Sequence, residues 1–117
     1  MTFFGKIFNR NKNDLYLDKI IDTDRNFFIS GRTVGEKYSE QEDVIRKLKR
    51  GHIFNIIITD KIEFVSDSFW KGFFNNIFKK YKTKESILKS FTFEIDDGEI
   101  LNNLMVNLEI LHLIHNP

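Results

Sequence analysis

Apolar residues fall into short blocks along the chain, and the spacing within each block predicts alternating strands and helices. The segment 53–59 is almost entirely apolar or β-branched, which is typical of a central strand covered by helices on both faces. The segment 90–95 alternates instead, which predicts a strand with Phe91, Phe93 and Ile95 on one face. These two strands define the centre of the predicted sheet.

Two further strands are expected before the first helix. The segment 15–21, with Leu15 and Leu17 apolar, and the segment 26–30 both fit short strands. The residues 22–24 between them, Asp-Thr-Asp, supply side chains that favour turns. We therefore expect an antiparallel hairpin at the start of the domain.

A capping box marks the first predicted helix. Ser39 is followed three residues later by Glu42, so a helix is expected to begin there, after a glycine-containing loop over 31–39. Its core face includes Val44, Ile45 and Leu48. Gly51 is expected to end this helix in a conformation with positive φ.

A wide aromatic stripe distinguishes the helix predicted after the strand 53–59. Ser66 or Asp67 is expected to cap that helix. Its apolar residues are Phe69, Trp70, Phe73, Phe74, Ile77 and Phe78. The stripe is too wide for a lightly attached surface helix. Either the helix packs on two sides within the domain, or one side of the helix binds a partner. In a homodimer, a second copy of the chain could cover that side.

The last helix is predicted to begin at a capping box formed by Asp96 and Glu99 and to run toward His112. A frayed end is expected around His112 and His115. The complete order is β-β-α-β-α-β-α, an α/β fold with a mixed sheet of about four strands and two to three packed helices. Nothing interrupts 13–117, which we interpret as a single domain.

The first twelve residues form a separate amphipathic segment. Its apolar residues at helical spacing are Phe3, Phe4, Ile7 and Phe8, and its three charges are all positive. The features of a secretory signal are not expected here, because the apolar region is short and interrupted. Two interpretations stay open: weak docking on an anionic membrane surface or a partner groove, or folding back onto the domain.

Composition excludes several classes of protein. The chain has 117 residues, of which 41% are hydrophobic and 30% charged, with 13 Phe and no Cys. This is a globular composition, and without Cys there are no disulfides, thiolate metal ligands or cysteine nucleophiles. A cytoplasmic location is the expectation. The longest apolar run falls far below the roughly 20 residues of a membrane span.

Charge is balanced overall but unevenly distributed. The net charge of +1 gives no general attraction to nucleic acid. Lysines crowd the segment 71–89, whereas residues from Glu94 onward include five acidic side chains and no Lys or Arg. The basic segment could contact phosphate or an acidic partner, or it could be a solvated helix face.

Part of the chain resembles a known family. The residues that carry the likeness are Gly31-Arg32, Gly35-Glu36, the strand 56–60, Ser68-Phe69 and Gly72-Phe73. Over somewhat more than half of its length, the chain resembles STAS-like domains of unassigned function, distant relatives of the anti-anti-sigma factors. The resemblance implies an α/β fold and a regulatory partner.

The same resemblance raises the question of phosphorylation. In anti-anti-sigma factors the strand-to-helix turn reads Phe-x-Asp-Ser-Ser-Gly, and its first serine is phosphorylated by a partner kinase. Here Ser66 stands in place of the aspartate, Asp67 in place of the phosphoacceptor, and Ser68 matches. Three interpretations stay open: Ser66 or Ser68 is modified at the helix N-terminus, Asp67 imitates a phosphoserine, or the three residues simply cap the helix.

Carboxylates offer a weaker candidate site. Asp60, Glu63 and Asp67 follow one predicted strand, and Asp96 and Asp97 follow the next. If these strands are parallel neighbours, the carboxylates could converge on Mg²⁺, although caps and turns also explain them. No catalytic motif of high specificity occurs, so we predict a protein that is not an enzyme, without cofactor or metal.

The predicted function is therefore that of a regulatory protein-interaction module. The predicted partner-binding residues lie in the loop 31–39 and along the edge 60–70 and its helix: Gly31, Arg32, Gly35, Glu36, Asp60, Trp70 and Phe74. Trp70 and Phe74 would be the aromatic anchors. The resemblance implies an ATPase of the histidine-kinase type as partner. The alternative is a small phage or mobile-element protein that blocks a host defence complex.

Overall fold

The computed structural model describes residues 12–20 and 27–117. The predicted amphipathic segment, except for Lys12, and the predicted turn at 22–24 lie outside the described residues. The elements, in chain order, are β1 Lys12–Tyr16, the 3-10 helix η1 Leu17–Ile20, β2 Phe28–Ile29, α2 Arg32–Gln41, α3 Val44–Lys49, β3 Ile53–Ile58, β4 Phe64–Val65, α4 Asp67–Tyr81, α5 Lys84–Leu88, β5 Phe91–Ile95 and α6 Gly98–His115. The α/β class is confirmed.

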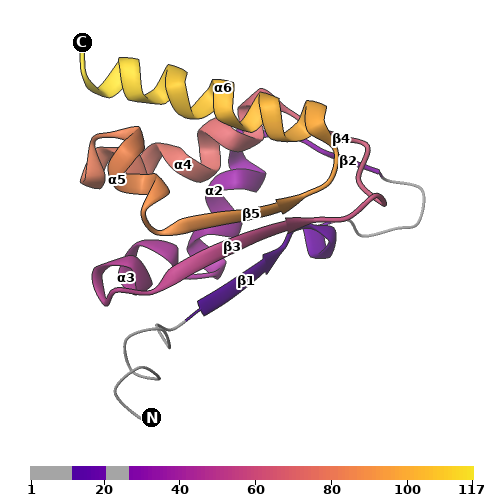
Figure 1. The fold of residues 1–117 in the computed structure, drawn as a ribbon, viewed down its shortest axis with the longest axis horizontal. Coiled ribbons are helices and arrows are strands. Elements are labelled where there is room, and N and C mark those ends of the chain that lie inside the picture. The colour runs from indigo at the N-terminus through magenta and orange to yellow at the C-terminus, as the bar shows by residue number, and fades with distance from the viewer. Residues whose placement is uncertain (1–11, 21–26) are drawn as a thin grey trace.

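Two small parallel sheets replace the predicted mixed sheet of about four strands. In the three-stranded sheet β3 lies between β1 and β5, with Ile56 opposite Leu15 on one side and Phe93 on the other. The short strands β2 and β4 pair with each other. Central placement of β3 is confirmed, whereas the order β-β-α-β-α-β-α is not observed (Figure 1).

The predicted antiparallel hairpin is wrong, because β1 and β2 belong to different sheets. The chain leaves the first strand early: Leu17 begins η1 and is buried. Asp18 in that turn accepts a hydrogen bond from the Thr59 hydroxyl at 2.5 Å, which ties η1 to the end of β3. The strand β2 is held instead by β4, where the backbone N–H of Ser66 donates to the carbonyl of Ile29.

Among the described residues, only one face of the three-stranded sheet is fully buried along β3. Phe54, Ile56 and Ile58 of β3 are buried and alternate with partly exposed residues. On the opposite face Asn55 donates to Glu94 at 2.7 Å and accepts from Thr92 at 2.8 Å. The predicted cover of β3 by helices on both faces is therefore wrong for the described part of the chain.

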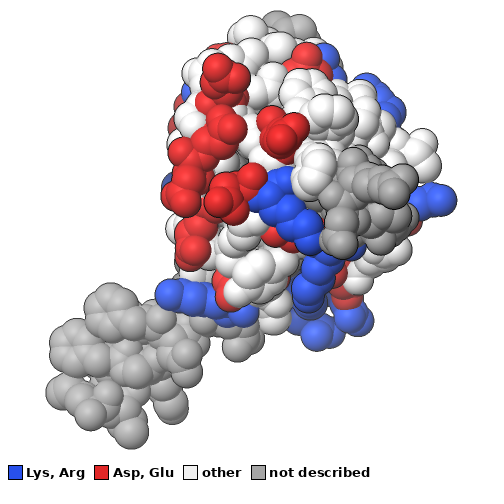
Figure 2. All heavy atoms as spheres, turned by 90° about the vertical axis from the view of Figure 1, so that its right-hand side faces the viewer, with Lys and Arg blue, Asp and Glu red and all other residues white. Residues whose placement is uncertain are grey.

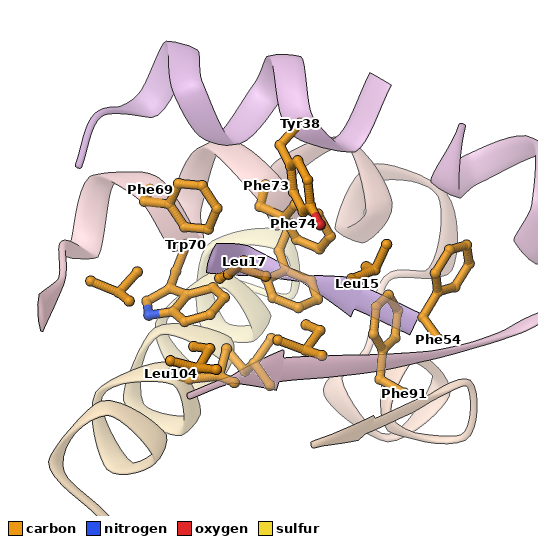
Figure 3. Close-up of a cluster of buried hydrophobic side chains, with 14 of the residues drawn as sticks. Leu15, Leu17, Tyr38, Phe54, Phe69, Trp70, Phe73, Phe74, Phe91 and Leu104 are labelled. Carbon is orange, nitrogen blue, oxygen red and sulfur yellow. The ribbon is translucent and has the colours of Figure 1, made fainter. Parts of the chain in front are cut away.

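Helix α4 occupies the centre of the domain. It packs against α2 and α6 and lies above the sheet, which explains its wide stripe. Its six large apolar side chains are at most 1% exposed: Phe69, Trp70, Phe73, Phe74, Ile77 and Phe78. Phe74 meets Phe91 of β5 with ring centroids 5.4 Å apart, and Figure 3 shows both rings in one cluster with Leu15. Of the two predicted roles for the stripe, packing within the domain is the one observed.

The contact between α2 and α4 brings their backbones together. A Cβ atom added at Gly35 would lie 2.2 Å from the carbonyl oxygen of Phe69. A Cβ atom added at Gly72 would lie 2.1 Å from the carbonyl oxygen of Arg32. Glycine is required at both positions because no side chain fits between the helices.

The first helix begins earlier than predicted. The segment expected as a loop over 31–39 forms α2, and Ser39 lies inside that helix, 8% exposed, rather than at a capping box. The break comes at Asp43, whose φ of 55° separates α2 from α3. Gly51 follows α3 with φ of 82°, so its predicted positive φ is confirmed.

Helix α6 is capped by Asp97, one residue after the predicted Asp96, and the Asp97 carboxylate accepts from the N–H groups of Glu99 and Ile100. The helix extends through His115, so the predicted frayed end is wrong. His112 accepts from the N–H of Lys84 at 2.9 Å, and His115 stacks on Phe78. In the segments that the structure describes, every helix is too short or too polar to cross a bilayer.

Candidate functional site

Ser66 connects three elements at the C-terminal end of the sheets. Its side chain caps α4 by accepting from the N–H of Phe69 at 3.1 Å. The same oxygen accepts from the N–H of Gly31 at 3.3 Å and lies 3.0 Å from the hydroxyl of Ser68. Of the two predicted caps, Ser66 is the one observed, and it also fixes the start of α2 against β4.

Asp67 has a structural partner that the sequence analysis missed. Its carboxylate accepts from the side-chain amides of Asn103 at 2.7 Å and Asn107 at 2.8 Å. Asn107 is 1% exposed on α6. Two Asn residues four apart on a mostly apolar helix are the signal that could have indicated this contact. Asp67 therefore joins the first turn of α4 to the middle of α6.

These amides also change the acidity of Asp67. The hydrogen bond from Asn107, followed by the one from Asn103, lowers the pKa of the Asp67 carboxyl below its ordinary value of 3.8. Because its pKa is lower in the folded state, the ionised Asp67 carboxylate stabilises the fold at pH values above 3.8. This contribution is lost as the pH falls through the folded pKa. At neutral pH the α4–α6 contact therefore has its full strength.

Removal of the Ser66 hydroxyl is expected to destabilise the fold. Ser66→Ala leaves the N–H groups of Phe69 and Gly31 without this acceptor, so we expect a loss of about 1–2 kcal/mol in the free energy of unfolding. Urea unfolding of the purified variant measures it. Ser68→Ala is the matched control, with an expected loss under half as large. Equal losses in the two variants would contradict the capping role.

The predicted partner-binding residues do not form one surface. Trp70 and Phe74 are 0% exposed, so their predicted role as surface anchors is wrong: α4 directs both rings into the core. Gly35 is buried against α4. The remaining four are at least partly exposed: Gly31, Arg32, Glu36 and Asp60. Asp60 follows β3, whereas the other three lie at or near the start of α2.

An exposed aromatic pair lies at the edge of the domain that was expected to be functional. Phe28 of β2 and Phe64 of β4 stand opposite each other in the strand pair. The two residues are 56% and 51% exposed, and their rings meet edge to face with centroids 6.1 Å apart. Each is followed by a buried residue, Ile29 or Val65. The alternation of one exposed and one buried residue in each strand is the only sequence signal for this pair. Neither Phe28 nor Phe64 was predicted as a surface residue of the site.

A shallow hollow adjoins Phe64. Its volume is about 210 Å³, and its lining residues come from the β4 segment and the first turns of α6: Glu63, Phe64, Val65, Glu99, Ile100 and Asn103. Glu63 and Glu99 are both exposed. Figure 2 looks toward the C-terminal ends of the strands and shows a band of acidic side chains on this side of the molecule. The hollow thus combines an aromatic wall, apolar residues and two carboxylates.

The five carboxylates considered for Mg²⁺ do not form a metal site in the described residues. Across 12–20 and 27–117, no group of three or more His, Cys, Asp or Glu side chains is arranged to hold a metal ion. Asp67 is turned to the amides of α6, and Asp97 caps that helix. Structural roles thus account for these two members of the set.

The chain matches no protein-family model, no curated protein and no solved structure at a significant level. The predicted relationship to STAS-like domains therefore rests only on the sequence residues that resemble that family.

Proposed function

We propose that this chain is a non-enzymatic protein-interaction module that binds its partner at an acidic aromatic edge formed by Phe28, Phe64, Glu63 and Glu99. The observation that carries the proposal is the exposed ring of Phe64, half accessible on a short strand beside a hollow with two carboxylates. Single exposed apolar residues are common on protein surfaces. An aromatic pair next to an acidic hollow is more specific, because aromatic anchors dominate many protein interfaces.

The chemistry of the hollow favours a basic side chain of the partner. Lys and Arg carry a long apolar stem and a charged head. The stem fits against Phe64 and Ile100, while the head reaches the carboxylates of Glu63 and Glu99. The Phe64 ring adds a cation–π contact. The partner surface is therefore expected to present Lys or Arg beside an apolar residue that covers Phe28.

The biological setting stays a prediction. A regulatory module that binds an ATPase of the histidine-kinase type and a mobile-element protein that blocks a host defence complex would both act by surface binding. Both would use the same edge. Identification of the protein that the edge captures from the source cell distinguishes them.

Substitution of Phe64 is expected to weaken binding without unfolding the domain. The ring is 51% exposed, so Phe64→Ala should cost less than about 1 kcal/mol of stability. Loss of an aromatic anchor is expected to weaken partner binding at least tenfold. Calorimetric titration with the purified partner measures the affinity.

The control uses another exposed aromatic residue. Tyr16, 42% exposed on β1, lies outside the proposed edge, so Tyr16→Ala should leave the affinity unchanged. The double variant E63Q/E99Q should weaken binding and reduce its dependence on salt. An affinity unchanged in Phe64→Ala, with the fold intact, would contradict the proposed edge.

A further inference from the structure

Positive charge gathers at the end of the domain where the strands of the three-stranded sheet begin. Lys12 is the first residue of β1 and lies opposite Ile53, the first residue of β3. Phe54 lies opposite Phe91, the first residue of β5, and its N–H donates to the carbonyl of Ser90 at 2.8 Å. The segments that lead into β3 and β5 therefore meet at this end, where Figure 1 shows α3 and α5.

Both of those segments are strongly basic. The segment 44–52, which forms α3 and leads into β3, carries four Lys or Arg residues and no carboxylate. The segment 79–90, which ends α4 and forms α5, carries five lysines and a single carboxylate. Leu48 of α3, Tyr81 of α4 and Ile87 of α5 line one small hollow, so the three helices meet there. The cations of the two segments therefore lie at the same end of the molecule.

Five of these cations are available to an external anion. We define the basic end as five exposed residues that begin, end or directly follow its elements: Lys12, Lys49, Arg50, Lys82 and Lys89. Within 12–20 and 27–117, none of the five forms an ion pair. Arg46 and Lys84 are not included because they pair with Asp43 and Glu109. The basic end is therefore suited to an anionic surface.

The opposite end of the domain carries the opposite charge. Carboxylates follow the strands there, as Asp60 does after β3 and Asp96 after β5, and Figure 2 shows the acidic band at that end. This separation of charge orients the molecule near an anionic surface, because the basic end is attracted and the acidic end is repelled. The edge around Phe64 would then face away from the surface.

An apolar segment of the chain is attached to the basic end. Residues 1–11 lead directly into Lys12, so their point of attachment lies at this end. Their sequence contains two cations and no carboxylate, with four large apolar residues at helical spacing: Phe3, Phe4, Ile7 and Phe8. Large apolar residues beside Lys and Arg are typical of segments that lie in the interface of a membrane.

We propose that the basic end docks on an anionic lipid surface and that the apolar residues of 1–11 insert among the lipids. Binding to such a surface combines buried apolar area with electrostatic attraction, and this chain supplies both at one end. Lipid is favoured over nucleic acid because phosphate groups alone require only the cations, whereas four large apolar residues gain free energy in an apolar environment. The acidic aromatic edge stays accessible to a protein partner in this orientation.

Sedimentation with lipid vesicles tests the proposal on the full chain. Vesicles of phosphatidylcholine alone are compared with vesicles of equal parts phosphatidylcholine and phosphatidylserine. The wild-type chain should bind the anionic vesicles roughly tenfold more tightly or better, and binding should weaken as salt increases. Equal binding to both kinds of vesicle, or binding to neither, would overturn the proposal.

Charge substitutions at the two ends of the domain form a matched pair of variants. Lys49→Gln combined with Lys89→Gln should weaken binding to the anionic vesicles about tenfold or more, since each cation near such a surface contributes roughly fivefold. Lys19→Gln combined with Lys61→Gln removes the same charge from exposed positions that follow β1 and β3. This control should keep its affinity within about twofold of wild type. Equal losses in the two double variants would indicate attraction by net charge alone and would overturn the proposal.

Substitution of apolar residues tests the other contribution. Phe4→Ser combined with Phe8→Ser leaves the charge unchanged and should weaken binding to the anionic vesicles roughly tenfold or more. Unchanged vesicle binding by this variant would overturn the proposal, and equally tight binding of duplex DNA would then assign the basic end to nucleic acid. Phe64→Ala should bind vesicles like wild type, so failure of this proposal and failure of the proposed partner-binding edge are distinguishable.

Discussion

Replacement of Gly35 with alanine is expected to destabilise the domain by about 3 kcal/mol or more in the free energy of unfolding. The added Cβ would lie 2.2 Å from the carbonyl oxygen of Phe69 and 2.7 Å from the backbone nitrogen of Phe73. Both obstacles are backbone atoms of α4, so no side chain can rotate away, and the two helices must separate. Urea unfolding followed by circular dichroism measures the loss.

The same chain offers a matched control for this substitution. Gly98 begins α6, and a Cβ atom there would meet nothing within 4 Å. Gly98→Ala should therefore be neutral or stabilising by up to about 1 kcal/mol, because alanine restricts the unfolded chain. Gly72→Ala, facing the carbonyl oxygen of Arg32 at 2.1 Å, should behave like Gly35→Ala. A Gly35→Ala variant as stable as Gly98→Ala would contradict the close approach of α2 and α4.

Replacement of Trp70 with alanine is expected to cost about 3–5 kcal/mol of stability. The ring is 0% exposed and packs against Phe69, with ring centroids 5.2 Å apart, and against Phe74. Its removal leaves a large cavity between α4 and neighbouring elements. Urea unfolding followed by circular dichroism measures the change, and any accompanying loss of partner binding should follow the loss of folded protein.

Trp70→Phe tests the packing contribution at this position alone. The indole N–H has no hydrogen-bond partner among the described residues, so phenylalanine removes volume without breaking a polar contact. We expect a loss of less than about half of that in Trp70→Ala. A Trp70→Ala variant that stays as stable as wild type but no longer binds its partner would restore the predicted anchor role and contradict the core role.

Elements whose apolar residues recur at regular spacing were predictable from the sequence. Elements that are very short, or whose buried residues are small, were not. The strands β3 and β5 and the helix α4 match the segments expected from their apolar residues. Helix α2 was predicted as a loop because its buried positions include Gly35 and Ser39, which carry no apolar signal. Close approach of α4 stabilises that helix, together with the one large buried side chain of α2, Tyr38, whose ring packs against Phe73.

The pairing of the short strands was not predictable for a different reason. The strands β2 and β4 are two residues long, too short for a period of two to be recognised. Their register depends on contacts far apart in sequence, such as the N–H of Glu63 donating to the carbonyl of Phe27. Local turn residues suggested a hairpin that the tertiary contacts override.

Of the residues predicted for the site, the structure confirms one structural role and excludes two surface anchors. Ser66 was expected as a cap and is one. Trp70 and Phe74 were selected because the stripe on α4 is wide, but the width reflects a helix in contact with α2, α6 and the sheet. The exposed Phe64 carried no special sequence signal, since one aromatic residue before a buried valine fits any strand. The STAS resemblance and phosphorylation of Ser66 or Ser68 stay predictions.

The parallel arrangement of both sheets has a consequence for how the chain reaches its native state. Every strand pair in the described residues joins segments roughly 40 positions apart, as Leu15 with Ile56, Phe28 with Phe64 and Ile56 with Phe93 show. Formation of each pair closes a long loop before any strand contact compensates for the lost chain entropy. Helix α4 lies between β3 and β5 in sequence and contacts several elements, so its early formation would shorten the search for the β3–β5 pair. We therefore expect docking of α4, rather than local turns, to govern the folding rate of this domain.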